Sequence, residues 1–84
     1  MTPFNPATTI RFGLPTPSHV SLVVYDMLGR EVVELMRGDM PAGTHSVTWN
    51  ASSNASGIYL ARLVALDEFG KERISKVVKL ILTK

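Results

Sequence analysis

The chain of 84 residues is long enough for one small domain, and its 45% of apolar residues with a net charge of +2 is typical of a folded chain rather than a disordered one. It has no cysteine, which excludes a disulfide framework and a thiolate metal site, so packing alone must stabilise the fold. The charge is uneven, because the segment 71–84 holds five basic residues and one acid, a net +4 that leaves −2 for the rest.

The first third of the chain alternates between apolar and polar residues, which is the pattern of half-buried strands. In TTIRFGLP the apolar residues Ile10, Phe12 and Leu14 share one face. HVSLVVYD is a second such run, and it closes at DMLGR, where Gly29 permits the positive φ of a hairpin turn. We therefore expect REVVELM to return antiparallel as a strand with a bulge, although its apolar spacing also fits one helical turn.

The middle of the chain predicts a loop, a strand and a connector. RGDMPAGTH, residues 37–45, concentrates Gly, Pro and Asp, so we expect a loop there. HSVTWN then alternates as a short strand that places Trp49 in the core. In WNASSNASGIY, Asn50 and Asn54 both satisfy the N-x-S acceptor rule, but the small polar residues suit a connector between two core strands better than a glycosylated loop.

Two longer segments follow, and both are apolar on two faces. IYLARLVAL is typical of a strand in the middle of a sheet or covered on both sides. KERISKVVKLILTK has the same character with lysines between the apolar residues. This basic end lacks the aromatic or Arg/Gly-rich composition of nucleic-acid modules, so we expect no nucleic-acid partner. About seven short strands without an amphipathic helix predict an all-β antiparallel sandwich of the immunoglobulin-like, fibronectin type, without a disulfide.

Catalysis fits these residues poorly. His19 and His45 have no HExxH or similar local partner, and no serine stands in a GxSxG elbow. The acids Asp39, Asp67 and Glu68 stand in expected turns, where they bond local backbone, and a calcium site would need them to converge from separate loops. We therefore predict no enzymatic activity, no cofactor and no metal.

Five pieces of the chain, in order, carry a family resemblance: NPATTIRF, YDMLGREV, PAGTHSVTW, SGIYLARL and KVVKLILTK. Together they resemble the type A C-terminal sorting domain of the type IX (Por) secretion system. The resemblance implies a non-catalytic signal that directs a passenger protein across the outer membrane of a cell of the Bacteroidota or a nearby lineage. It also implies the translocon and sortase-like components as partners, and a location in the periplasm during transit and then at the cell surface or outside the cell.

The resemblance assigns roles to particular positions. Asn5-Pro6 matches an opening turn, and Gly29 and Gly43 match turn glycines. The residues implied in sorting or partner recognition are Gly57, Tyr59, Lys76, Val77, Val78, Lys79, Leu80 and Lys84. The ending KVVKLILTK departs from the common form by about two extra apolar residues. Its strand has two interpretations, an exposed edge that docks a partner or a plain core strand.

The chain is expected to be a single sorting domain over residues 1–84, with residues 1–7 as a lead, cut from a larger secreted protein and monomeric in isolation. No apolar run approaches the roughly 20 residues of a membrane helix, so we expect no membrane insertion. The alternative function is a structural or carbohydrate-binding accessory module of a secreted polysaccharide-degrading enzyme. That function needs an exposed aromatic row, to be sought among Tyr25, Trp49, Tyr59 and Phe69.

Overall fold

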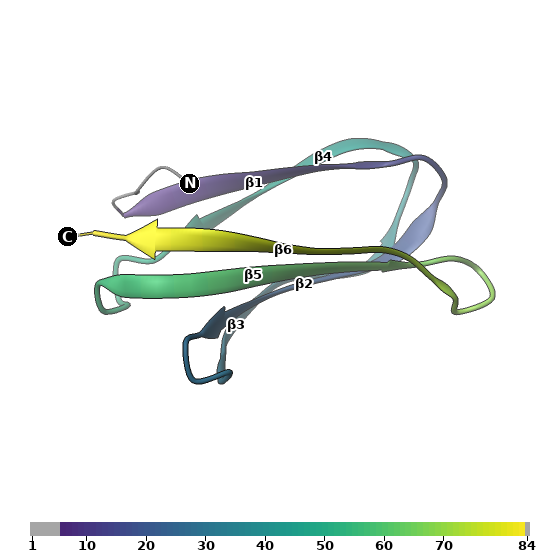
Figure 1. Ribbon diagram of the computed structural model, residues 1–84. Helices are drawn as coiled ribbons and strands as arrows, with labels where there is room; N and C mark the ends of the chain where they lie inside the picture. Colours follow the sequence, from purple (N-terminus) through teal and green to yellow (C-terminus); the bar gives the residue numbers. More distant parts are fainter. Residues whose placement is uncertain (1–5, 84) are drawn as a thin grey trace.

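The computed structural model describes residues 6–83, and within this range it consists of strands and the turns between them (Figure 1). The six strands are β1 (Ala7–Leu14), β2 (Ser18–Asp26), β3 (Glu31–Met40), β4 (Gly43–Asn50), β5 (Gly57–Leu66) and β6 (Glu72–Leu82). Every pairing is antiparallel. The expected all-β antiparallel fold is confirmed, with six strands where about seven were expected.

The strands form two sheets that pack as a sandwich. One sheet contains β1 and β4, and the other has the order β3-β2-β5-β6. Figure 1 shows the smaller sheet lying across one face of the larger one. The chain therefore passes between the sheets after β1, after β3 and after β4, and β5 occupies an inner position of the larger sheet. The inward residues of β5 are buried against the small sheet, and the apolar residues of its outward face, Ile58, Leu60 and Val64, are half-buried between the neighbouring strands β2 and β6.

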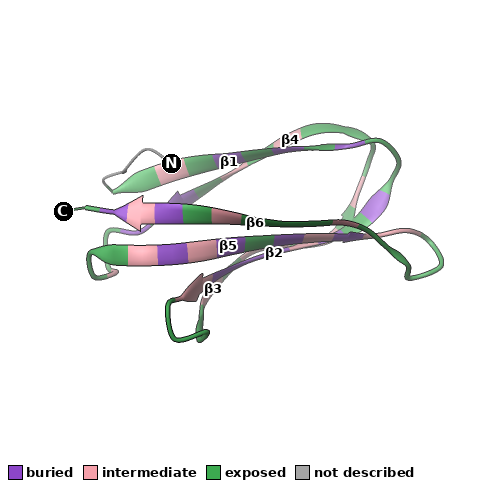
Figure 2. Ribbon diagram, in the orientation of Figure 1, coloured by how far each residue is buried: buried purple, intermediate pink, exposed green. Residues whose placement is uncertain are grey.

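The core lies between the sheets and is built by alternate residues of facing strands (Figure 2). The face of β1 that carries Ile10, Phe12 and Leu14 is buried, as predicted. The face of β2 that carries Val20, Leu22 and Val24 is buried as well. Trp49 is 3% exposed, and its ring meets the ring of Tyr59 edge-on with 5.2 Å between centroids. Because Trp49 belongs to β4 and Tyr59 to β5, this aromatic pair joins the two sheets. The prediction that Trp49 anchors the core is confirmed.

The prediction of a loop over residues 37–45 is wrong in extent. β3 continues to Met40 and β4 begins at Gly43, so only residues 41 and 42 lie outside the strands. The reason is pairing with two strands: β2 pairs with residues 37–40 and β1 pairs with residues 43–45, so backbone groups at both ends of this segment are satisfied. Asp39, expected in a turn, accordingly lies in β3. Two register shifts between β2 and β3 confirm the bulged strand rather than a helical turn.

Two hairpin turns of the larger sheet have the same construction. Asp26 Oδ1 accepts the backbone N–H groups of Leu28 and Arg30, at 2.9 and 3.0 Å, in the β2–β3 turn. In the β5–β6 turn, Asp67 Oδ1 accepts those of Phe69 and Lys71, each at 2.9 Å. The glycine in each turn, Gly29 or Gly70, has a positive φ of 82° or 77°. The hairpin predicted around Gly29 is therefore confirmed.

The repeated Asn-Ala-Ser segment is the connector between β4 and β5, as interpreted from the sequence. Ala51 is fully buried, and its N–H donates to the Pro6 carbonyl at 2.8 Å. The Tyr59 hydroxyl donates to the Ala55 carbonyl at 2.6 Å, which ties the connector to the start of β5. The connector thus carries the chain from the small sheet to the large one. Asn5, the first residue of the expected opening turn, lies outside the described residues.

Candidate functional site

The C-terminal strand lies at an edge of the larger sheet. β6 pairs with β5 alone, in a register that places Tyr59 opposite Leu80, Arg62 opposite Val77 and Leu63 opposite Lys76. A strand with one neighbour leaves alternate backbone N–H and C=O groups unpaired on its other side. The position expected of a docking edge is therefore present.

The residues predicted for recognition divide between the two faces of β6. Val77 is 60% exposed and Lys79 is exposed on the outer face of the sheet, away from β1 and β4. Val78 is half-buried against the core, and Leu80 is 2% exposed within it. Lys76 shares the inward face with Val78 yet is exposed. β6 consequently contributes side chains to the core on one face and exposes side chains on the other.

The remaining predicted residues have structural positions. Tyr59 is buried, with its ring on Trp49 and its hydroxyl on Ala55. Gly57 is the first residue of β5, with a φ of 156°, and it pairs with Leu82. Gly57 and Tyr59 lie at the start of β5, where they pair with Leu82 and Leu80 at the end of β6. Tyr59 is too deeply buried to offer a partner a broad surface. Lys84 lies outside the described residues.

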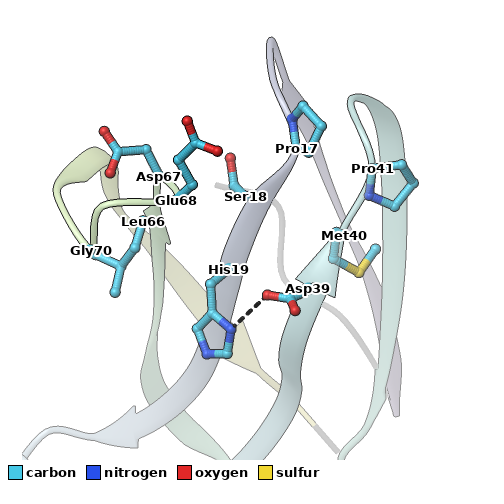
Figure 3. Close-up of a pocket in the computed structure, with 10 residues that line it drawn as sticks. All are labelled: Pro17, Ser18, His19, Asp39, Met40, Pro41, Leu66, Asp67, Glu68 and Gly70. Atoms are coloured by element: carbon cyan, nitrogen blue, oxygen red, sulfur yellow. Dashed lines mark hydrogen bonds and ion pairs between the residues drawn. The ribbon is translucent and has the colours of Figure 1, made fainter.

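A hollow of about 800 Å³ lies at the end of the molecule where β2 begins (Figure 3). It contains an ion pair between His19 Nδ1 and Asp39 Oδ1 at 3.1 Å, while the carboxylates of Asp67 and Glu68 point away from that pair. Asp67 is already bonded to two backbone N–H groups and to Arg73. Within residues 6–83 no three His, Asp or Glu side chains gather closely enough to hold a metal ion. His45 Nε2 donates to the Pro41 carbonyl at 2.8 Å and lies outside this hollow.

The aromatic residues do not form the exposed row that a sugar-binding surface needs. Trp49 and Tyr59 are buried, and Tyr25 is half-buried near the β2–β3 turn. Phe69 is 86% exposed, but it lies in the β5–β6 turn at the opposite end of the larger sheet. The described residues therefore offer no observation that favours the carbohydrate-binding alternative. They also include no helix that could cross a membrane.

Within the described residues, the sandwich exposes strand edges and basic side chains, and such edges can pair with an extended segment of another protein. A family model described as a secretion system C-terminal sorting domain (Por_Secre_tail) matches residues 2–81. The chain therefore belongs to this family of type IX secretion sorting domains. The role of the family is that of a sorting signal for export to the cell surface or the extracellular space, and not that of a catalyst. The comparison with curated proteins gave no match.

Proposed function

We propose that residues 1–84 form one sorting domain that the type IX translocon recognises through β6. The domain directs a passenger protein, located upstream in the same chain, from the periplasm across the outer membrane. Sortase-like components then act on the exported chain. The observation that carries this proposal is the combination of the family match over residues 2–81 with an edge position for the C-terminal strand.

The exposure of each side chain separates the residues of β6 that can contact the translocon from those that stabilise the strand. Val77 and Lys79 project from the outer face, so they supply side-chain contacts to the translocon. Leu80 and Tyr59 are buried and keep the strand in register, so their effect on sorting is indirect. Gly57 acts in the same indirect way, and Lys84 extends the basic end of the signal.

A fusion tests the proposal. Residues 1–84 are attached to an exported reporter in a host with a type IX system, and the reporter is measured outside the cell. A deletion of residues 76–84 should abolish export, but it also removes the buried Leu80 and Leu82 and so compromises folding. The sharper variant is Val77→Ser with Lys79→Ser, which changes only side chains on the exposed face.

The matched control is Glu34→Ser with Arg37→Ser, a pair on β3 at the opposite edge of the same sheet. We expect the Val77/Lys79 variant to lose export while its purified domain keeps the circular dichroism of the parent. The Glu34/Arg37 variant should still export the reporter. Full export by the Val77/Lys79 variant would refute recognition through the outer face of β6, and failure of the unaltered domain to direct export would refute the sorting function.

A further inference from the structure

A groove of about 260 Å³ lies between β1 and β6, where the two sheets leave one side of the sandwich open. β1 pairs only with β4, and β6 only with β5, so each strand presents a free edge on this side. Figure 1 shows the two strands running alongside each other. The walls include Ile10, Phe12, Ile74 and Val78, and the floor includes Leu22 and Leu63. On the opposite side of the sandwich the short turn at residues 41–42 links β3 directly to β4.

The size and lining of the groove suit part of a peptide. Small-molecule sites usually enclose about 300–1,000 Å³ and bury most of the ligand. This groove is smaller, and its floor is apolar, with Leu22 at 1% and Leu63 at 5% exposure. Two unpaired strand edges beside an apolar floor can take up an extended segment, whose backbone pairs with an edge while alternate side chains enter the groove.

Two cations that form no ion pair with a described residue lie at this groove. Arg11 of β1 and Lys76 of β6 both line it and both are exposed, Arg11 on the face of β1 opposite Ile10 and Phe12 and Lys76 on the inward face of β6. The ion pairs of the described residues involve other partners: His19 with Asp39, Arg30 with Asp26, Arg37 with Glu34 and Arg73 with Asp67. The described chain therefore supplies no carboxylate to either groove cation.

The place of Lys76 determines which segment can bind. It lies on the inward face of β6 between Ile74 and Val78. The other inward residues in this part of the strand are apolar, so a lysine interrupts the apolar face. A purely apolar strand laid against this edge would desolvate an unpaired ammonium group, which is unfavourable. A strand that brings a carboxylate to the mouth of the groove forms an ion pair instead. Lys76 thus rejects apolar strands and favours acidic ones.

We propose that the groove between β1 and β6 binds an extended segment of a protein partner in which apolar residues alternate with glutamate or aspartate. The apolar side chains enter the groove, and the carboxylates pair with Arg11 and Lys76. This inference rests on the proposed function, because it identifies the chemistry of the translocon segment that recognises the domain. The binding itself is measurable without secretion.

The direct test follows the backbone amide signals of the isotopically labelled chain by NMR during titration with a synthetic peptide of alternating valine and glutamate. We expect concentration-dependent shifts in β1 and β6 around the groove, and unchanged signals in β3. A peptide of alternating valine and lysine should cause no shifts, and neither should polyglutamate, which lacks the apolar side chains. Absence of shifts with the valine–glutamate peptide, or equal shifts with polyglutamate, would overturn the inference.

Charge reversal provides the second test. The double variant Arg11→Glu with Lys76→Glu should bind the valine–glutamate peptide roughly tenfold more weakly, as expected from the loss of two exposed ion pairs. It should also gain affinity for the valine–lysine peptide. The control Arg62→Glu reverses an exposed charge on the outer face of β5 and should change neither affinity. Equal effects of the control and the double variant would show a general charge effect and would contradict a specific groove.

Export of the reporter fusion separates this inference from the proposed function. If the unaltered domain directs export and the Arg11/Lys76 variant exports equally well, the groove is not a translocon site and the sorting function stands. If the unaltered domain binds the valine–glutamate peptide in the groove but directs no export, the sorting function is refuted and the binding chemistry stands. Loss of export in the Arg11/Lys76 variant, with export preserved in the Glu34/Arg37 variant, supports both.

Discussion

At the scale of single residues, two aspartates organise the hairpins of the larger sheet. The carboxylates of Asp26 and Asp67 accept backbone N–H groups and also pair with Arg30 and Arg73. The backbone hydrogen bond from Arg30 is the main cause that lowers the pKa of Asp26, and that from Lys71 is the main cause for Asp67. Because the folded-state pKa lies below the unfolded value, each carboxylate stabilises the fold only while it is ionised.

The first prediction concerns Asp67→Asn. The contribution of the carboxylate is fully present above the unfolded pKa, about 4, and is lost as the pH falls through the lower folded pKa. The variant should therefore be less stable than the parent at pH 7 and should lose less stability on acidification. Urea unfolding midpoints measured from neutral to strongly acidic pH test this.

The control for Asp67→Asn is Glu68→Gln, which neutralises the exposed neighbouring carboxylate. Glu68 forms no ion pair with a described residue, so this variant should retain the acid dependence of the parent. Parallel stability curves for Asp67→Asn and the parent would contradict the role assigned to the Asp67 turn.

The second prediction concerns Gly29→Ala. Gly29 has a φ of 82°, which an alanine adopts only with strain, although a Cβ there would meet open space. We expect a loss of about 1 kcal/mol in the free energy of unfolding, measured by urea denaturation. Gly13→Ala is the matched control, because that strand position has no positive φ and equally open space. A comparable loss at Gly13 would show that the turn conformation is not the cause.

At the scale of the element, β6 serves the core and the surface with opposite faces of one strand. Its second half buries Leu80 and Leu82, and its middle exposes Lys76, Val77 and Lys79. The buried residues attach the strand to β5 and the core, and the exposed residues stay available to a partner. This separation means that stability and sorting can be altered by different substitutions in the same short strand.

The third prediction compares Leu80→Ala with Val77→Ala. Removing the Leu80 side chain leaves a cavity beside Tyr59 and should cost about 2–5 kcal/mol of unfolding free energy. Val77 is 60% exposed, so its truncation should change the stability by less than about 0.5 kcal/mol. Urea denaturation measures both values. A large loss for Val77→Ala would mean that this residue packs in the fold and is not free for recognition.

At the scale of the whole molecule, the small sheet depends on the large one. β1 and β4 form only a two-stranded sheet, which is marginally stable by itself in water. Ile10, Phe12, Leu14 and Trp49 bury their side chains in the shared core. Packing on the larger sheet therefore supplies the stability that the two strands lack. The contact of Trp49 in β4 with Tyr59 in β5 is part of this packing.

The fourth prediction is that both sheets unfold together. Trp49 is the single tryptophan of the chain, so its fluorescence reports the small sheet and its contact with β5, and far-ultraviolet circular dichroism reports all strands. The two signals should give coincident urea transitions. A tryptophan transition at clearly lower urea than the circular dichroism transition would show that the small sheet detaches first.

Much of the fold could be predicted from local pattern. Alternation over TTIRFGLP and HVSLVVYD, and the glycine in DMLGR, specified two strands and a hairpin without any knowledge of their neighbours. The segment 37–45 could not be predicted in this way, because its Gly and Pro residues favour a loop until pairing with β2 and β1 satisfies the backbone. A pairing partner can thus override local propensity.

The candidate site also has features that follow from the local sequence and features that depend on strand pairing. The sequence by itself determined that the C-terminal strand is apolar on both faces and basic, which pointed to β6 before its neighbours were known. Only the tertiary structure decided that β6 lies at an edge and that Lys76 and Arg11, far apart in the chain, line one groove. The physical reason is that alternation is a property of one strand, whereas an edge, a groove and an unpaired charge depend on which other strands are absent beside it.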